Sequence, residues 1–169
     1  LLVYDRSDMD VRRLEGLQPL SGPLVGGMPP QWITVEEHGF SFLVDVVHGH
    51  KTGHYLDQRL NRVRVAQYCS GAEVLNAFSY TGGFGVHALG EGAQAVIDVD
   101  TSQEALALGR RNVAINGLPA NRRTEVVGDV FQVLRRLRDE GRRFDVVVLD
   151  PPKFAFSKKQ IASACRGYK

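Results

Sequence analysis

The hydrophobic pattern of the chain changes near residue 60. In residues 32–46 apolar positions alternate with polar ones on both sides of Glu36-Glu37-His38-Gly39, which is typical of a β-hairpin with one buried face. The preceding 30 residues are rich in glycine and proline, which disfavours a helix and predicts turns around a short strand. Residues 1–60 are therefore expected to form a small, β-rich domain.

From residue 61 onward, short apolar runs alternate with stretches of helical periodicity. The run 144–149 has a wholly apolar core, as in strands that are buried on both faces of a parallel sheet. Residues 61–169 are therefore expected to form an α/β, Rossmann-like domain that ends at a sheet edge, since four strands are few for a doubly wound sheet. Strands are predicted at 73–77, 95–99, 124–127 and 144–149, and helices are predicted to end near Leu89, to run from Ser102 to about Asn116, and to span Val130 to Leu137.

The residues that follow each strand are the candidate site, because open parallel sheets bind ligands beyond the carboxyl ends of their strands. The first strand leads into a glycine-rich turn, Asn76 to Phe84, which lacks the GxGxxG pattern because Phe78 and Tyr80 replace glycines. The second strand ends in Asp98 and Asp100, and an acidic residue about 20 residues beyond such a turn is suited to binding a ribose diol. Asp100 is nearer the tip and is preferred, the alternative being that it only caps the next helix.

Acidic residues also follow the third and fourth strands. Asp129 is placed to accept an adenine amino hydrogen, although aspartate is equally suited to capping the next helix. Asp150 opens the segment Asp150-Pro151-Pro152-Lys153-Phe154, in which two prolines fix an extended turn and Phe154 provides an aromatic platform. Such a rigid loop is suited to holding a planar base taken out of its stack.

Acidic strand ends, a glycine-rich turn and a rigid loop form the pattern of a class I S-adenosylmethionine-dependent methyltransferase. From about Trp32 to the end, the chain resembles the RlmI family of bacterial 23S rRNA cytosine-5 methyltransferases. The motifs that carry the resemblance are Glu36–Phe40, Gly49–Arg59, Leu75–Phe84, Asp150–Phe154 and Ala164–Lys169.

The resemblance implies an enzyme with an N-terminal PUA RNA-binding domain, a small central β domain and a catalytic domain. The chain is expected to begin after the PUA domain, to stop after the fourth strand, and to lack the family's nucleophilic cysteine, which would lie beyond Lys169. On its own it is expected not to methylate RNA. The expected catalytic residues are Asp150 and Lys153; the expected residues for S-adenosyl-L-methionine are Arg59, Asn76, Phe78, Ser79, Tyr80, Gly82, Asp100, Thr101, Ser102, Asp129 and Val130; those for RNA are Lys51, Tyr55, Pro151, Pro152 and Phe154.

Methylation of cytosine at C5 requires a thiolate that first adds to C6. Cys165, flanked by Arg166 and Lys169, and Cys69 are the two cysteines of the chain. Free cysteine is most often a small buried residue, so both are predicted to be structural. Neither has a histidine at metal-ligand spacing, and no metal site is predicted at the histidines of the β domain, His38, His48, His50 and His54.

The net charge of +2 conceals an asymmetry, with 3 basic and 7 acidic residues in 1–50 but 18 and 12 in the remainder. The last 19 residues hold five cations and no carboxylate, which fits either a polyanionic partner or a solvated face. The arginine pairs at 122–123, 135–136 and 142–143 are expected to be solvated. The absence of a long apolar run and the small number of cysteines favour a cytoplasmic protein whose partner, by resemblance, is 23S ribosomal RNA.

Two alternatives stay open. A methyltransferase of the same fold would act on guanine or an exocyclic amine, because loops with two prolines and an aromatic residue also suit amino-group methylation. A non-catalytic RNA-binding module would retain only the fold. A cysteine in a strand beyond Lys169 would favour the cytosine-5 enzyme, its absence would favour the first alternative, and loss of Asp100 or Asp150 would have favoured the second.

Overall fold

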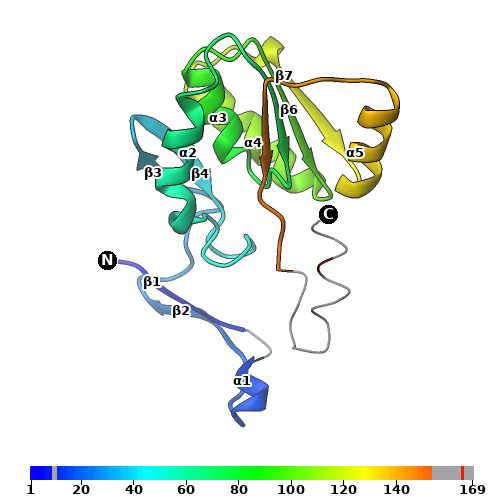
Figure 1. Ribbon diagram of the computed structural model, residues 1–169. Helices are drawn as coiled ribbons and strands as arrows, with labels where there is room; N and C mark the ends of the chain where they lie inside the picture. The colour runs from blue at the N-terminus through cyan, green and yellow to red at the C-terminus, as the bar shows by residue number, and fades with distance from the viewer. Residues whose placement is uncertain (9–10, 154–164, 166–169) are drawn as a thin grey trace. The chain divides into compact units, whose positions relative to one another are not determined.

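The chain divides into two compact units, Leu1–Leu60 and Asn61–Lys169, which are described separately below. The structure is a computed structural model that describes residues 1–8, 11–153 and 165 (Figure 1). The boundary between the units lies inside α2 (Arg59–Ala66), close to the point where the hydrophobic pattern changes. Among the helices described, none is both long and apolar enough to cross a bilayer.

The N-terminal residues form a paired sheet, where the sequence predicted turns around one strand. Strand β1 (Val3–Ser7) pairs antiparallel with β2 (Leu20–Val25), and the short helix α1 (Val11–Leu14) lies between them in sequence. Strand β2 contains Pro23, which pairs with Tyr4. A two-stranded sheet has open edges, so it tolerates a residue that cannot donate a backbone hydrogen bond.

The predicted hairpin is confirmed. Strand β3 (Ile33–Glu37) pairs antiparallel with β4 (Phe40–Val44), and residues 38 and 39 form a two-residue turn. His38 and Gly39 have φ values of 48° and 84°, as a type I′ turn requires. Phe42 and Val44 are buried, as is Glu37. The 3-10 helix η1 (Leu56–Gln58) then leads into α2.

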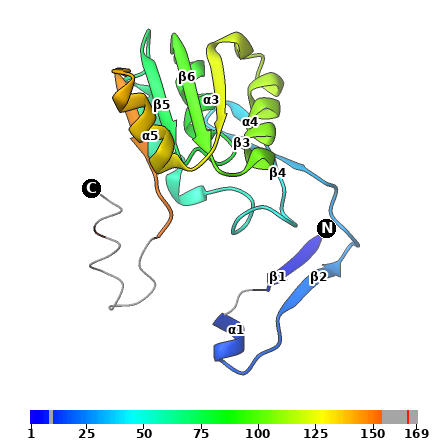
Figure 2. The same ribbon diagram turned by 90° about the vertical axis from the view of Figure 1, so that its right-hand side faces the viewer.

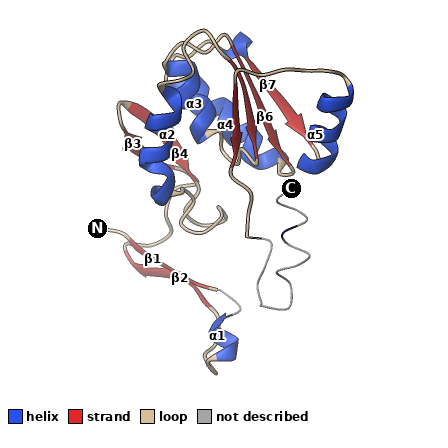
Figure 3. Ribbon diagram, in the orientation of Figure 1, coloured by secondary structure: helices blue, strands red, loops and turns tan. Residues whose placement is uncertain are grey.

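The second unit is built on a four-stranded parallel sheet, as predicted. Its strands are β5 (Glu73–Ala77), β6 (Ala95–Asp100), β7 (Arg123–Val127) and β8 (Val146–Leu149), in the order β7-β6-β5-β8. The strands lie side by side in Figure 3. Numbered from the first strand of this unit the order is 3-2-1-4, so the chain reverses direction across the sheet between β5 and β8, where doubly wound folds bind ligands.

Helices cover both faces of this sheet (Figures 1 and 2). Helices α3 (Gly83–Gly90) and α4 (Gln103–Ile115) pack on one face, and α5 (Val130–Asp139) packs on the other. A short 3-10 helix, η2 (Ala120–Arg122), connects α4 to β7. The core on the α5 face consists of Leu75, Ala77, Val99, Val130, Val133 and Leu137. Because strand residues alternate between faces, Asn76, Asp98 and Asp100 face α3 and α4.

Strand β8 differs from the prediction that it is buried on both faces. Val148 is buried, but Val147 and Leu149 are 51% and 58% exposed. Within the described residues β8 pairs only with β5, so it forms an edge of the sheet. An apolar run indicates that a strand can be buried, whereas the position of the strand in the sheet determines how much of its surface is buried.

Candidate cofactor and active site

The turn after β5 is held in an uncommon backbone conformation. Phe78, Tyr80 and Gly82 have φ values of 59°, 49° and 74°. The left-handed region is costly for bulky aromatic residues and persists only where the surroundings enforce it, often at functional sites. Here the Ser79 amide donates to the Val99 carbonyl at 3.0 Å, and the Gly82 amide donates to the Ser79 carbonyl at 2.9 Å. The turn is thereby fixed against the carboxyl end of β6.

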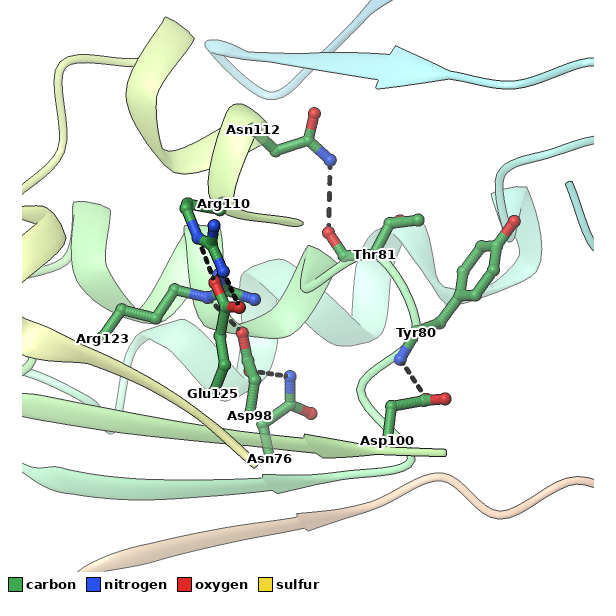
Figure 4. Close-up of polar contacts among 9 residues, drawn as sticks. All are labelled: Asn76, Tyr80, Thr81, Asp98, Asp100, Arg110, Asn112, Arg123 and Glu125. Atoms are coloured by element: carbon green, nitrogen blue, oxygen red, sulfur yellow. Dashed lines mark hydrogen bonds and ion pairs between the residues drawn. The ribbon is translucent and has the colours of Figure 1, made fainter. Parts of the chain in front are cut away.

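Asp100 joins this turn to the start of α4. Its Oδ2 accepts from the Tyr80 amide at 2.7 Å (Figure 4). Its Oδ1 accepts from the Ser102 amide at 2.9 Å. The helix cap is Ser102, whose Oγ accepts from the Ala105 amide at 3.1 Å. The alternative that Asp100 only caps the next helix is therefore wrong. Since a carboxylate has about four acceptor positions and these two bonds occupy two, Asp100 keeps acceptor capacity for ligand hydroxyls.

Ser79 provides a test of whether the turn suits a polar ligand. The residue is 7% exposed, and its Oγ is buried without a hydrogen-bond partner among the residues that the structure describes. Buried hydroxyls are nearly always paired, because desolvating one without a partner costs roughly 1–3 kcal/mol. The unpaired Ser79 hydroxyl lies in the turn that Asp100 holds through the Tyr80 amide, and a polar group of a bound ligand would provide its missing partner.

Asp98 lies two residues before Asp100 in β6 and is buried below the end of the strand. Its side chain is fully buried, accepts from Asn76 Nδ2 at 2.7 Å, and pairs with Arg123 Nε at 2.6 Å. Burial raises the pKa of Asp98, and the charge of Arg123 and the hydrogen bond from Asn76 oppose that rise. Asn76 is 1% exposed and supports Asp98 from the neighbouring strand, and the expectation that it binds the cofactor stays a prediction.

The expectation that the 122–123 arginine pair is solvated is wrong for Arg123. Its side chain is 2% exposed, and it bridges Asp98 and Glu125. Glu125 also accepts two hydrogen bonds from Arg110, at 3.0 Å and 2.6 Å (Figure 4). Burial alone would raise the pKa of Glu125, but the hydrogen bonds and charges of Arg110 and Arg123 together lower it. Arg122 is exposed, as expected.

The third strand end carries a helix cap. Asp129 is exposed, and its Oδ1 accepts from the Gln132 amide at 2.8 Å, so the capping alternative is confirmed. Val130 is 2% exposed and packs in the core beneath α5. Thr101 is exposed beside Ser102. A contact between Asp129 and adenine stays a prediction, which the cap does not exclude because one carboxylate oxygen is not used by it.

The fourth strand end brings Asp150 to the same edge of the sheet as Asp100, since β5, β6 and β8 run parallel. Asp150 and Pro151 are half-buried, whereas Pro152 and Lys153 are exposed. Phe154 lies outside the described residues. The strand order places Asp150 beside the point between β5 and β8 at which the sheet reverses, so this loop borders the expected ligand crevice.

Three predicted residues belong to the first unit or to its end. Lys51 Nζ lies 4.5 Å from the centroid of the Tyr55 ring and 3.8 Å from Asp57. Arg59 is exposed at the start of α2. Their roles in binding RNA or cofactor stay predictions.

The first unit also contains a buried pair that was not anticipated from the sequence. His54 Nε2 lies 3.2 Å from Glu37 Oε2, and its ring lies against Phe42. The sequence signal was Glu37 at an inward position of the hairpin. In the described part of the chain, no three His, Cys, Asp or Glu side chains are grouped to hold a metal ion.

The two cysteines differ in environment. Cys69 is fully buried, its thiol donates to the Val65 carbonyl at 3.4 Å, and burial and the charge of Glu91 raise its pKa. A buried thiol with a raised pKa is a poor nucleophile, as predicted. Cys165 is exposed, so the expectation that it is a small buried residue is wrong.

A parallel sheet in the order 3-2-1-4, with a tight turn clamped by an acidic residue at the end of its second strand, defines a nucleotide-binding α/β domain of the Rossmann-like class. The sequence family described as S-adenosylmethionine-dependent methyltransferase matches residues 20–166. The chain belongs to this family, which confirms the expected Rossmann-like fold and the expected resemblance to methyltransferases that use S-adenosylmethionine as cofactor.

Relatives and solved structures agree with this assignment. The chain is 54% identical to ribosomal RNA large subunit methyltransferase I of Klebsiella pneumoniae and 53% identical to that of Escherichia coli (strain K12), over 99% of the chain. It spans 42% of the length of each of these relatives. The crystal structure of SMU.776 complexed with SAH is 35% identical, with a TM-score of 0.74 over 82% of this chain and 37% of that one. The SAM-dependent methyltransferase from Agrobacterium tumefaciens, 23% identical, shares the fold with a TM-score of 0.73 over 81% of this chain and 44% of that one.

Proposed function

We propose that the chain is the cofactor-binding part of an enzyme that methylates C5 of a cytosine in 23S ribosomal RNA. The observation that carries the cofactor part is Asp100, which clamps the turn after β5 through the Tyr80 amide while keeping acceptor capacity at the sheet edge. The RNA part rests on similarity to relatives named ribosomal RNA large subunit methyltransferase I. A ribosomal substrate also makes the cytoplasm the expected location.

S-adenosylmethionine, when bound, supplies a methyl group on a positively charged sulfonium. In the proposed site the Asp100 carboxylate would accept hydrogen bonds from the ribose hydroxyls, and Asp129 would accept one from the adenine amino group. The turn from Phe78 to Gly82 would hold the methionine end, for which the Ser79 hydroxyl would serve as a donor or acceptor. Thr101 and Ser102, at the same strand end as Asp100, complete the contacts to the cofactor.

Asp150, Lys153 and Phe154 are proposed to hold the target base. The two prolines between Asp150 and Lys153 fix the loop before RNA arrives, which lowers the entropic cost of gripping a base that has left its stack. Lys51 and Tyr55 are proposed to contact the RNA chain. As the family resemblance implies, the thiolate that adds to C6 is proposed to come from a cysteine beyond Lys169 and from neither Cys69, which is buried, nor Cys165, which is exposed.

Two measurements test the proposal. Isothermal titration of the chain with S-adenosylhomocysteine tests the cofactor part, for which saturable one-site binding is expected. Incubation of the full-length protein with labelled cofactor and unmodified 23S rRNA, followed by mass spectrometry of nucleosides, tests the substrate. We expect 5-methylcytidine. A methylated exocyclic amine or a methylated guanosine would instead support the same fold with amino-group or guanine chemistry, and no methylation would favour an RNA-binding module.

A further inference from the structure

The buried ion pair of Asp98 and Arg123 lies against the turn after β5, Phe78–Gly82. Asp98 faces the start of α3, where a Cβ on Gly85 would come within 2.8 Å of Asp98 Oδ1, and one on Gly82 within 3.1 Å of Oδ2. Glycine at both positions therefore allows the carboxylate to lie against the backbone of the turn and of the first turn of the helix. Gly82 is itself part of the turn that Asp100 clamps from the other end.

Arg123 reaches the same turn from β7. Its Nη2 is buried and has no hydrogen-bond partner in the described part of the chain. A Cβ on Gly109 of α4 would meet this nitrogen at 2.6 Å and the Thr81 carbonyl oxygen at 3.1 Å, and a Cβ on Gly82 would meet the nitrogen at 3.5 Å. The guanidinium therefore fills the space where Gly82 of the turn and Gly109 of α4 come close together.

Two further contacts fix this arrangement. Asn112 Nδ2, from α4, donates to the Thr81 carbonyl at 3.2 Å (Figure 4). On the other side Glu125 holds the Arg123 guanidinium and is itself held by two hydrogen bonds from Arg110. A series of contacts thus runs from the exposed Arg110 through Glu125 to Arg123 and Asp98, which lie next to Gly82, while Asn112 holds Thr81 separately.

Stability alone does not account for such a pair. Replacing a buried ion pair with well-packed apolar residues is often neutral or stabilising, because desolvation of the charges offsets their attraction. Asp98 and Arg123 also occupy a face of the sheet on which the apolar residues Val74 and Val96 are buried. A charged pair at this place, enclosed by three glycines, is better explained by a requirement for one defined position of the turn.

We propose that the Asp98–Arg123 pair is a positioning device that sets the conformation of residues 79–82 and thereby the affinity for the cofactor. This inference rests on the proposed function of the turn. Neither residue touches the ligand: Asp98 acts through Gly82 and Gly85, and Arg123 acts through Gly82 and through the space that it shares with Thr81 beside Gly109.

The sharpest variant is Gly109→Ala. Alanine has a higher helix propensity than glycine, so the substitution stabilises α4 itself. The added methyl group, however, displaces Arg123 Nη2 and the Thr81 carbonyl. The double variant Asp98→Asn/Arg123→Gln removes the charges without leaving one buried charge unpaired. Leu137→Ala is the control, because it weakens the core on the opposite face of the sheet.

The readouts are amide hydrogen exchange at residues 79–82 and the affinity for S-adenosylhomocysteine, each compared with global thermal unfolding. We expect both test variants to lose exchange protection at the turn and to bind at least about tenfold more weakly. Leu137→Ala should lower the unfolding temperature with affinity unchanged within about twofold. Test variants that keep native protection at residues 79–82 overturn the inference. A native chain that fails to bind refutes the cofactor role of the turn instead, while the exchange measurement still decides whether the pair positions it.

Discussion

Replacing Asp100 with alanine is the most direct test of the cofactor site. The substitution removes the acceptor of the Tyr80 amide at 2.7 Å, the acceptor of the Ser102 amide at 2.9 Å, and the proposed acceptor of the ribose hydroxyls. Hydrogen bonds to charged groups contribute roughly 1.5–3 kcal/mol each. Loss of one such bond to the ligand corresponds to a rise in Kd of about 10-fold to 150-fold, and disorder of the turn would add to this.

The assay is isothermal titration of native chain and variant with S-adenosylhomocysteine, alongside thermal unfolding without ligand. Glu140→Gln is the matched control, since it removes one exposed carboxylate at the end of α5, away from the strand tips. Asp100→Asn is an intermediate case that keeps one oxygen acceptor. Affinity for Asp100→Ala within twofold of the native value, in a variant that is still folded, would refute the assignment of Asp100 to the ribose.

Three further predictions concern the pH dependence, the helix caps and the base-binding loop. Because the pKa of Glu125 is lowered in the folded state, its carboxylate stabilises the fold at pH values above its ordinary pKa of 4.5, and this contribution is lost as the pH falls through the lower folded pKa. Glu125→Gln should therefore flatten the dependence of the unfolding temperature on pH below about 5. An unchanged profile would contradict the pairing of Glu125 with Arg110 and Arg123. Ser102→Ala should lower the free energy of unfolding by about 1 kcal/mol through loss of the cap on α4, measured by urea denaturation with exposed Thr101→Ala as control; a loss no larger than that of the control would contradict the cap. In the full-length protein, Phe154→Ala should reduce RNA methylation far more than cofactor affinity, and equal losses would show that the residue only shapes the cofactor site.

The strands and helices of the second unit were predictable because each depends on a local period. Apolar runs such as 73–77 mark strands, and Ser102 marks a helix start by its side-chain chemistry, so the predicted elements agree with β5 and α4. Asp100 was identified by its place at a strand end, which is also a local property. These features require no knowledge of which strand lies beside which.

The role of Arg123 was not predictable in this way. Adjacent arginines beside a loop are usually solvated, and nothing in the local sequence distinguishes Arg123 from Arg122. Its burial depends on the parallel register of β6 with β7, which pairs Asp98 with Glu125 and so brings Arg123, two residues earlier, to the same face. The same limit applies to Val147 and Leu149, whose exposure depends on the place of β8 in the sheet.

The open edge of β8 has a practical consequence for any solution study of the chain. In the described residues, β8 presents one row of backbone amides and carbonyls without a neighbouring strand, together with the exposed side chains of Val147 and Leu149. Such an edge is a template for a strand from another molecule. Self-association there would grow with protein concentration and would lie next to Asp150, so a titration at high concentration could report competition between chains where ligand affinity is intended. Light scattering across the concentration range, with Val147→Lys as a variant that blocks the edge, separates the two effects.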